Sequence, residues 1–288
     1  MEETTRQGAE ETTRQGMDET TRRGMRRTTV VTGDSGGIGQ AVAAELTRRG
    51  HRVIGVARTG DVRADLALMR ETARAADEIL ARTDRVDGVV LCAGVLSTVA
   101  EWTDEGFERT LALNYLSRFL LVQRLLPALS EAPAGRVVLV ANAGKYRDSL
   151  DLGDLMLRRG GGRGLKVSGR TQFANDLFAV ELAERVRGSR IAVSCVYPGP
   201  VATGVFRNAR GVSGPLRTAA VAVQRLGAAA PAEGARTPVH LADDPGATGG
   251  FYGPRLRRRT IPGRVLRRDR RAGLWAASEG LIQSFARR

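Results

Sequence analysis

Short runs of consecutive apolar residues alternate with longer amphipathic segments over most of the chain. Such runs are typical of strands that are buried on both faces of a sheet. They occur at 28–32, 52–56, 86–93, 136–141, 191–197 and 247–252. Between the first two runs, Ile38, Val42 and Leu46 recur at helical spacing, and Gly50 closes the segment. The alternation predicts an α/β fold in which helices cover both faces of a parallel sheet.

Two segments depart from this pattern. Residues 1–24 repeat with a period of eight (MEETTRQG, AEETTRQG, MDETTRRG) and contain almost no apolar residue. Such a segment cannot repay the entropy of ordering, so we expect a flexible tail at 1–25 and a single domain at 26–288. The stretch 204–235 is rich in Ala, Gly and Arg and precedes the last predicted strand. It predicts either a helical lid over a substrate or a surface insertion with little packing.

The formal net charge is +14, and arginine carries almost all of the positive charge, because Lys145 and Lys166 are the only lysines. Many of the arginines lie in the stretch 255–271. A basic stripe of this kind can bind nucleic acid or another acidic surface. No nucleic-acid motif accompanies it, so we expect a solvated surface that steers anionic ligands, and no nucleic-acid partner.

The cysteine, histidine and hydropathy patterns argue against several other classes. Cys92 and Cys195 lie inside apolar runs, where buried free thiols are more common than metal ligands. The two histidines are far apart in the chain, which argues against a histidine-based metal site. No run of about 18 apolar residues occurs, and the N-terminus lacks the apolar stretch of a secretory signal. We therefore expect a cytoplasmic protein without a metal or a membrane span.

A glycine-rich turn, TGDSGGIG at 32–39, joins the first predicted strand to the first predicted helix. Glycines permit a tight turn and a close backbone approach, so the N–H groups at the helix N-terminus can bind a pyrophosphate. The spacing T-G-x3-G-I-G differs from the three-glycine fingerprint of ordinary dehydrogenases. With the strand before it and the helix after it, the chain resembles the short-chain dehydrogenase/reductase family. The resemblance covers most of 28–280 and implies a Rossmann-like doubly wound parallel sheet of about seven strands.

The resemblance also implies a set of dinucleotide-binding residues. Arg58 follows the second strand, where an NAD-preferring member would usually carry an acidic residue, and an arginine there can pair with a ribose 2′-phosphate. We therefore expect NADPH as the cofactor, with NADH as a weaker substitute. The other positions that match the family are Gly33, Ser35, Gly37, Ile38 and Gly39 in the turn, Asp65 and Leu66 beside the adenine, Ala93 and Gly94 after the strand VVLCAG, and Pro198, Gly199, Val201 and Thr203 beside the nicotinamide.

The catalytic half departs from the family pattern. Members usually combine a serine that orients the carbonyl, a tyrosine that gives the proton and a lysine that lowers the tyrosine pKa. In this chain the serine position falls on Ala141 or Asn142, depending on the alignment. The helix GLKVSGRTQFANDLF places Ser168 at the tyrosine position and Gln172 at the lysine position. Catalysis is therefore either lost or carried out by other groups.

Several residues are candidates for the altered chemistry. Asn114 matches the helix asparagine that holds a relay water in many members. Asn142 or Ser168 would hydrogen-bond the carbonyl oxygen, and Tyr146 or Tyr197, which lie beside strand ends, would supply the proton. Alternatively, a hydroxyl of the substrate next to the ketone supplies the proton, because an intramolecular donor has a high effective molarity.

We interpret the chain as an NADPH-dependent ketoreductase. General acid catalysis contributes about 10²- to 10⁴-fold, so its loss slows a reductase without abolishing it. The arginine-rich composition and the altered site resemble tailoring reductases of antibiotic pathways, which implies a polycyclic aromatic polyketide as the ketone. The alternative is an inactive NADP(H)-binding sensor or scaffold. A homo-oligomer is also expected from the resemblance, because the helices around 106–130 and 168–187 pair subunits in many relatives.

Overall fold

In the computed structural model, eight strands of the described residues form one sheet in the order β3-β2-β1-β4-β5-β6-β7-β8. The structure describes residues 26–159, 162–202, 204, 209–215, 218, 222 and 228–286. The strands are β1 (Thr28–Thr32), β2 (Arg52–Ala57), β3 (Val62–Arg63), β4 (Gly88–Leu91), β5 (Gly135–Val140), β6 (Ile191–Val196), β7 (Gly250–Tyr252) and β8 (Arg258–Arg259). All neighbours are parallel except β7 and β8, which are antiparallel.

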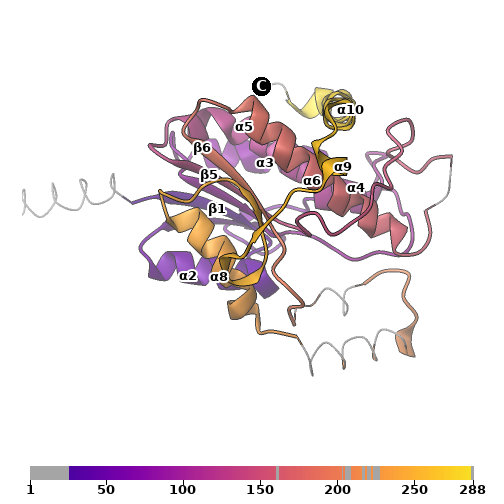
Figure 1. Ribbon diagram of the computed structural model, residues 1–288, viewed down its shortest axis with the longest axis horizontal. Coiled ribbons are helices and arrows are strands. Elements are labelled where there is room, and N and C mark those ends of the chain that lie inside the picture. Colours follow the sequence, from indigo (N-terminus) through magenta and orange to yellow (C-terminus); the bar gives the residue numbers. More distant parts are fainter. Residues whose placement is uncertain are drawn as a thin grey trace, which may run out of the picture.

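Helices cover both faces of the sheet (Figure 1). They are α2 (Gly37–Arg48), α3 (Met69–Leu80), α4 (Arg109–Leu111), the π-helical turn η1 (Ala112–Leu116), α5 (Ser117–Ser130), α6 (Lys166–Arg185), α8 (Pro231–Asp243), the 3₁₀ turn η2 (Pro254–Leu256), α9 (Gly263–Leu266) and α10 (Arg268–Ala286). Helices α2 and α8 pack on one face, whereas α3, α5 and α6 pack on the other. This arrangement confirms the predicted Rossmann-like doubly wound sheet.

All six predicted strands are present, although the run at 86–93 forms a strand only over Gly88–Leu91. The central strands β1 and β4 carry no exposed residue, as expected for a sheet that is covered on both faces. Two further strands, β3 and β8, were not predicted. Each has only two residues, Val62–Arg63 and Arg258–Arg259, and so leaves no apolar run in the sequence.

Helix α10 lies over α5 and α6, on the side away from the sheet (Figure 1). The Trp275 ring of α10 is 4.9 Å from the Phe119 ring of α5 and 6.0 Å from the Phe178 ring of α6. The guanidinium of Arg185 lies 4.0 Å from the centroid of the same indole ring. A C-terminal helix of this chain therefore occupies part of the surface through which we expected α5 and α6 to pair subunits.

The expected tail at 1–25 lies outside the described residues, as do residues 205–208, 216–217, 219–221 and 223–227 of the expected lid at 204–235. The last residues of that stretch, from Pro231 onward, begin α8 and pack on the sheet. Two backbone bridges involve residues of this stretch. Ser97 pairs with Arg210, and Val201 pairs with Ala229.

Candidate active site

The predicted glycine turn lies between β1 and α2. Gly33 has a φ of 72°, which favours glycine, and a Cβ on Gly39 would lie 2.2 Å from the carbonyl oxygen of Gly33. The hydroxyl of Thr32 accepts the backbone N–H groups of Cys92 and Ala93, both at 3.1 Å, and so joins the ends of β1 and β4. The turn leaves Ser35 exposed beside the N-terminus of α2, where N–H groups favour an anion.

The other predicted cofactor residues follow the carboxyl ends of parallel strands and therefore share one edge of the sheet. Arg58 follows β2, and Asp65 and Leu66 follow β3. Residues 93–94 follow β4, and residues 198–201 follow β6. Because the strand order reverses between β1 and β4, this edge is where open α/β sheets bind their ligands. Thr203 lies outside the described residues.

The side chains of two of these residues have protein partners. The carboxylate of Asp65 accepts the backbone N–H of Ala67 at 3.0 Å and pairs with Arg109 at 3.3 Å. Leu66 is buried. Arg58, by contrast, is exposed, and no described carboxylate forms an ion pair with it. Its guanidinium is therefore available to an anionic ligand.

Ser168, at the family's tyrosine position, is buried and fully hydrogen-bonded. Its hydroxyl accepts the backbone N–H of Ser97 at 2.7 Å and donates to the carbonyl oxygen of Ser97 at 2.8 Å. The single hydroxyl proton is thus already committed to a backbone carbonyl. Ser168 is placed to fix the loop after β4, and it would have to break this bond to donate to a substrate.

Gln172, one turn further along α6, is different. Its Oε1 atom is buried and has no hydrogen-bond partner among the described residues. Buried polar atoms without a partner are uncommon, and each one requires an explanation. A hydrogen-bond donor of a bound ligand would satisfy this atom. Gln172 cannot, however, supply the positive charge that a lysine would bring to the same position.

Asn114 lies in the π-helical turn η1 that precedes α5. Its side-chain amide accepts the N–H of Val95 at 2.8 Å and donates to the carbonyl oxygen of Val95 at 2.9 Å. The backbone carbonyl oxygen of Asn114 accepts a hydrogen bond from the side-chain amide of Asn175 at 2.9 Å. Asn114 therefore positions the loop after β4.

Arg118, which the sequence analysis did not single out, connects the ends of two central strands. Its guanidinium is buried and donates to the carbonyl oxygens of Ala93 (2.7 Å) and Val140 (3.0 Å) and to the side-chain oxygen of Asn175 (3.2 Å). Burial lowers the pKa of Arg118 to about 10, so it remains a cation at neutral pH. No signal in the sequence separates Arg118 from Arg124, the second arginine of α5.

The loop after β5 carries Asn142. The next two residues, Ala143 and Gly144, both have positive φ angles, of 41° and 82°. Arg259 donates to the carbonyl oxygen of Ala143 at 3.1 Å, and Arg264 donates to that of Gly144 at 2.8 Å. Two arginines of the basic stretch 255–271 therefore hold this loop, although most of the stretch is exposed, as the composition had led us to expect.

Asp176 of α6 holds the same loop from inside. Its carboxylate accepts the N–H of Gly144 at 2.9 Å and lies 3.4 Å from the thiol sulfur of Cys195 on β6. Burial raises the pKa of Asp176 to about 7, although the bond from Gly144 and the charges of Arg264 and Arg259 oppose the rise. The protonation of one buried carboxyl therefore changes near neutral pH, directly beside the loop that presents Asn142.

Two tyrosines follow the carboxyl ends of strands: Tyr146 lies in the loop after β5, and Tyr197 follows β6. The ammonium of Lys145 is 4.0 Å from the centroid of the Tyr197 ring, which places a cation against the residue that follows β6. The Tyr146 ring packs on Gly169 of α6, where a Cβ would lie 3.1 Å from two ring carbons. The structure thus brings both tyrosines close to the altered site.

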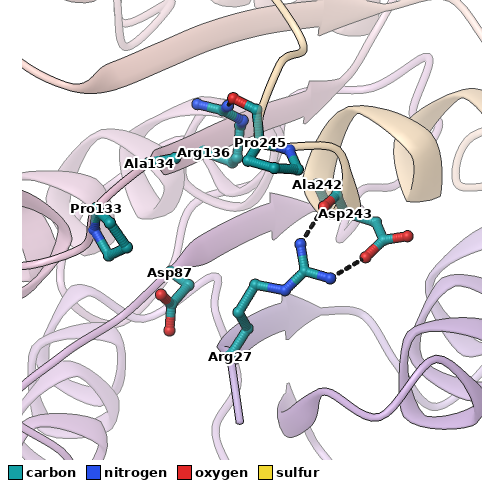
Figure 2. Close-up of a pocket in the computed structure, with 8 residues that line it drawn as sticks. All are labelled: Arg27, Asp87, Pro133, Ala134, Arg136, Ala242, Asp243 and Pro245. Carbon is teal, nitrogen blue, oxygen red and sulfur yellow. Dashed lines mark hydrogen bonds and ion pairs between the residues drawn. The ribbon is translucent and has the colours of Figure 1, made fainter. Parts of the chain in front are cut away.

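A pocket of about 250 Å³ lies at the opposite edge of the sheet (Figure 2). Figure 2 shows the guanidinium of Arg27 directed at the end of α8, where it binds the carboxylate and the carbonyl oxygen of Asp243. Arg136 donates to the carbonyl oxygens of Asp244 and Pro245. These residues precede or begin strands, and their charges are already satisfied within the chain. The pocket is therefore not the candidate active site.

Comparisons with known proteins decide the family. A family model described as short chain dehydrogenase matches residues 27–148. The human protein named dehydrogenase/reductase SDR family member 13 is 34% identical over 279 residues, which cover 88% of this chain and 72% of that protein. The chain belongs to the short-chain dehydrogenase/reductase family. It is thus an oxidoreductase, as the sequence predicted.

Other members show the same relationship. Human retinol dehydrogenase 14 is 29% identical over 294 residues, which cover 88% of this chain and 86% of that protein. The crystal structure of a 3-alpha-hydroxysteroid dehydrogenase from Pseudomonas sp. B-0831, complexed with NADH, superposes with a TM-score of 0.65. It covers 78% of this chain and 94% of that one at 23% identity, which is evidence for the fold alone. Among the described residues, no helix has the length and apolar character needed to cross a membrane.

Proposed function

We propose that the chain is an NADPH-dependent ketoreductase whose proton comes from the substrate's own hydroxyl group or from water. The observation that carries the proposal is a contrast at the carboxyl ends of the strands, between the residues that would bind the cofactor and the residues at the family's catalytic positions. The cofactor-binding residues retain the glycine turn and an available arginine, Arg58. At the catalytic positions, in contrast, Ser168 and Gln172 replace the family's tyrosine and lysine. The buried hydroxyl of Ser168 is bonded at both its donor and acceptor sites.

The described residues fit a dinucleotide. Gly39 leaves no room for a side chain between the turn and α2, so a pyrophosphate can approach the backbone. Arg58 would hold the 2′-phosphate, and the unpartnered Oε1 of Gln172 would accept a hydrogen bond from a ribose hydroxyl. When bound, the reduced dinucleotide supplies the hydride. Arg118 and Asn114 keep the loop after β4 in place.

The proton source follows from the side chains. A tyrosine with a neighbouring lysine is absent from α6, and no charge from Gln172 can activate Ser168. Losing such an acid costs about 10²- to 10⁴-fold. A phenol or enol next to the ketone compensates, because it is held close to the developing alkoxide within the same molecule. Asn142 is the group of the β5 loop that would orient the carbonyl oxygen.

The proposed substrate is a polycyclic aromatic polyketide of an antibiotic pathway, in which ketones commonly lie beside phenols. In its missing triad the chain resembles the angucyclinone ketoreductase of simocyclinone biosynthesis. A second candidate is retinal, because a relative that shares most of this chain's length is named retinol dehydrogenase 14. Retinal has no hydroxyl next to its carbonyl group. The two candidates therefore differ in whether the substrate can supply the proton.

We further propose that residues 26–288 act as one domain and that the stretch 204–235 is a lid. The bridges from Ser97 to Arg210 and from Val201 to Ala229 support the lid, because they attach two positions within the stretch to the segments that follow β4 and β6. Arg210 also pairs with Glu101. Closure of such a segment would exclude water from the ketone.

The test follows NADPH absorbance with a panel of hydroxyquinone-type ketones and with retinal. We expect turnover of the hydroxylated ketones and slow or no turnover of their O-methylated analogues. Asn142→Ala, Ser168→Ala and Tyr197→Phe should all keep measurable activity with the hydroxylated ketones. A collapse in one variant would identify a protein acid instead. Tight NADPH binding without oxidation by any ketone would favour the sensor or scaffold.

A further inference from the structure

The residue after the first glycine of the turn, Asp34, has an unusual environment. Its carboxylate lies against β2, where Oδ2 is 2.0 Å from the position of a Cβ on Gly55. Its Oδ1 is 2.9 Å from the corresponding position on Gly60. Any side chain at Gly55 would therefore displace this carboxylate. The space that Asp34 occupies explains why the buried part of the strand RVIGVA contains a glycine.

The Oδ1 atom of Asp34 is buried and has no hydrogen-bond partner among the described residues. Burial raises the pKa of Asp34, as does the charge of Asp61, and a bond with the residue's own backbone partly opposes the rise. An unpaired buried carboxylate oxygen is costly unless a donor reaches it. The fold has made room for the carboxylate without giving Oδ1 a donor from the chain.

The position of this carboxylate indicates which donor is missing. Asp34 lies within the cofactor-binding turn, and Arg58 is the residue that follows β2. The turn after β2 closes through a bond from the N–H of Gly60 to the carbonyl oxygen of Ala57 at 3.2 Å. The Asp34 carboxylate and Arg58 thus belong to the same end of β2, and no ion pair joins them among the described residues. A ribose hydroxyl donates to a carboxylate, whereas a 2′-phosphate is attracted by an arginine and repelled by a carboxylate.

We propose that Asp34 is a cofactor-specificity residue whose carboxylate accepts a hydrogen bond from a hydroxyl of the adenosine ribose. It favours NADH and so opposes the preference for NADPH that Arg58 confers. The chain consequently binds both dinucleotides, with a narrower preference for NADPH than Arg58 alone would give. This inference rests on the proposed function only in requiring that a nicotinamide dinucleotide binds at this edge.

The experiment measures the dissociation constants of NADPH and NADH by calorimetry, without any ketone. Asp34→Asn should tighten NADPH and weaken NADH, so that the ratio of the two constants shifts by roughly tenfold, the size of one charged hydrogen bond. Asp61→Asn removes a nearby exposed carboxylate and serves as the matched control, with a much smaller shift. Equal changes for both dinucleotides in Asp34→Asn would overturn the proposal.

A second variant keeps the test decisive if Asp34→Asn is poorly folded. Gly55→Ala places a methyl group where Oδ2 now lies, so it should displace the carboxylate and shift the ratio in the same direction. The same substitution in an Asp34→Ala background should leave the ratio unchanged. A shift that persists without Asp34 would contradict the inference. Failure of the unaltered chain to bind either dinucleotide would instead overturn the proposed function as well.

Discussion

Replacing Asp176 by asparagine should stabilise the protein, and the gain should grow with pH. Burial raises the pKa of this carboxyl from its ordinary value of 3.8 to about 7 in the folded chain. The folded state therefore binds the proton more tightly than the unfolded state does. As pH rises from 3.8 towards 7, the unfolded state releases its proton first, so the free energy of unfolding falls. Above about pH 7 the free energy of unfolding falls no further on account of Asp176, because its carboxyl is ionised in both states.

The difference between the two pKa values corresponds to about 4 kcal/mol at full effect. Asp176→Asn removes the buried charge, and its side-chain oxygen can still accept the N–H of Gly144. Cys195 of β6 and Arg259 and Arg264 of the C-terminal segment are the charged or titratable groups that face this position. The two arginines keep their bonds to the backbone of the loop after β5 in the variant.

The assay is urea denaturation of the unaltered chain and the variant between about pH 4.5 and about pH 8. We expect a small gain at the acid end and a gain of several kcal/mol at the alkaline end. Asp84→Asn, which changes an exposed carboxylate, provides the control and should follow the unaltered chain. If the gain from Asp176→Asn is the same at both ends, the buried carboxyl carries no penalty and the reasoning is refuted.

Three other substitutions test different parts of the structure. Gly39→Ala should abolish dinucleotide binding in calorimetry while the chain stays folded by circular dichroism, because the new Cβ would lie 2.2 Å from the carbonyl oxygen of Gly33; unchanged affinity would remove the turn from the site. Trp275→Ala should lower the free energy of unfolding by about 3–5 kcal/mol, since the indole is buried between α5 and α6; a loss below about 1 kcal/mol would show that α10 does not depend on this contact. Ser168→Ala should reduce turnover less than tenfold in the NADPH absorbance assay, because the hydroxyl proton is committed to Ser97; a loss of about 10³-fold would make Ser168 the acid.

The central part of the fold could be predicted from the sequence because it depends on local patterns. Val30 and Val31, which are neighbours in β1, are both buried. A strand that is covered on both faces requires an uninterrupted run of apolar residues, and such a run is visible in the sequence. The glycine turn could be predicted for a similar reason, since Gly33 and Gly39 satisfy steric demands of a few neighbouring atoms. Short elements leave no such record, and β8 consists of two arginines whose pairing with β7 depends on the whole sheet.

The environment of the site could not be predicted, because its contacts join distant parts of the chain. Ser168 binds the backbone of a residue 71 positions away, and Arg264 binds the carbonyl oxygen of a residue 120 positions away. Composition gave no means of separating Arg259 and Arg264, which donate hydrogen bonds to the loop after β5, from the other arginines of the stretch 255–271. The role of Asp34 likewise depends on Gly55 and Gly60, which come near only through the pairing of β1 with β2.

The account depends on hydride transfer at a site where Ser168 and Gln172 of α6 stand at the family's tyrosine and lysine positions. The most direct test uses NADPH that carries one deuterium at C4 of the nicotinamide, with each of the two stereochemical forms tested separately. The chain is incubated with one form and a hydroxyquinone-type ketone, and the product is analysed by mass spectrometry. We predict one deuterium on the new carbinol carbon from one of the two forms, both for the unaltered chain and for a chain that carries Ser168→Ala and Tyr197→Phe together. A product without deuterium, or its loss in the double variant, would contradict the account.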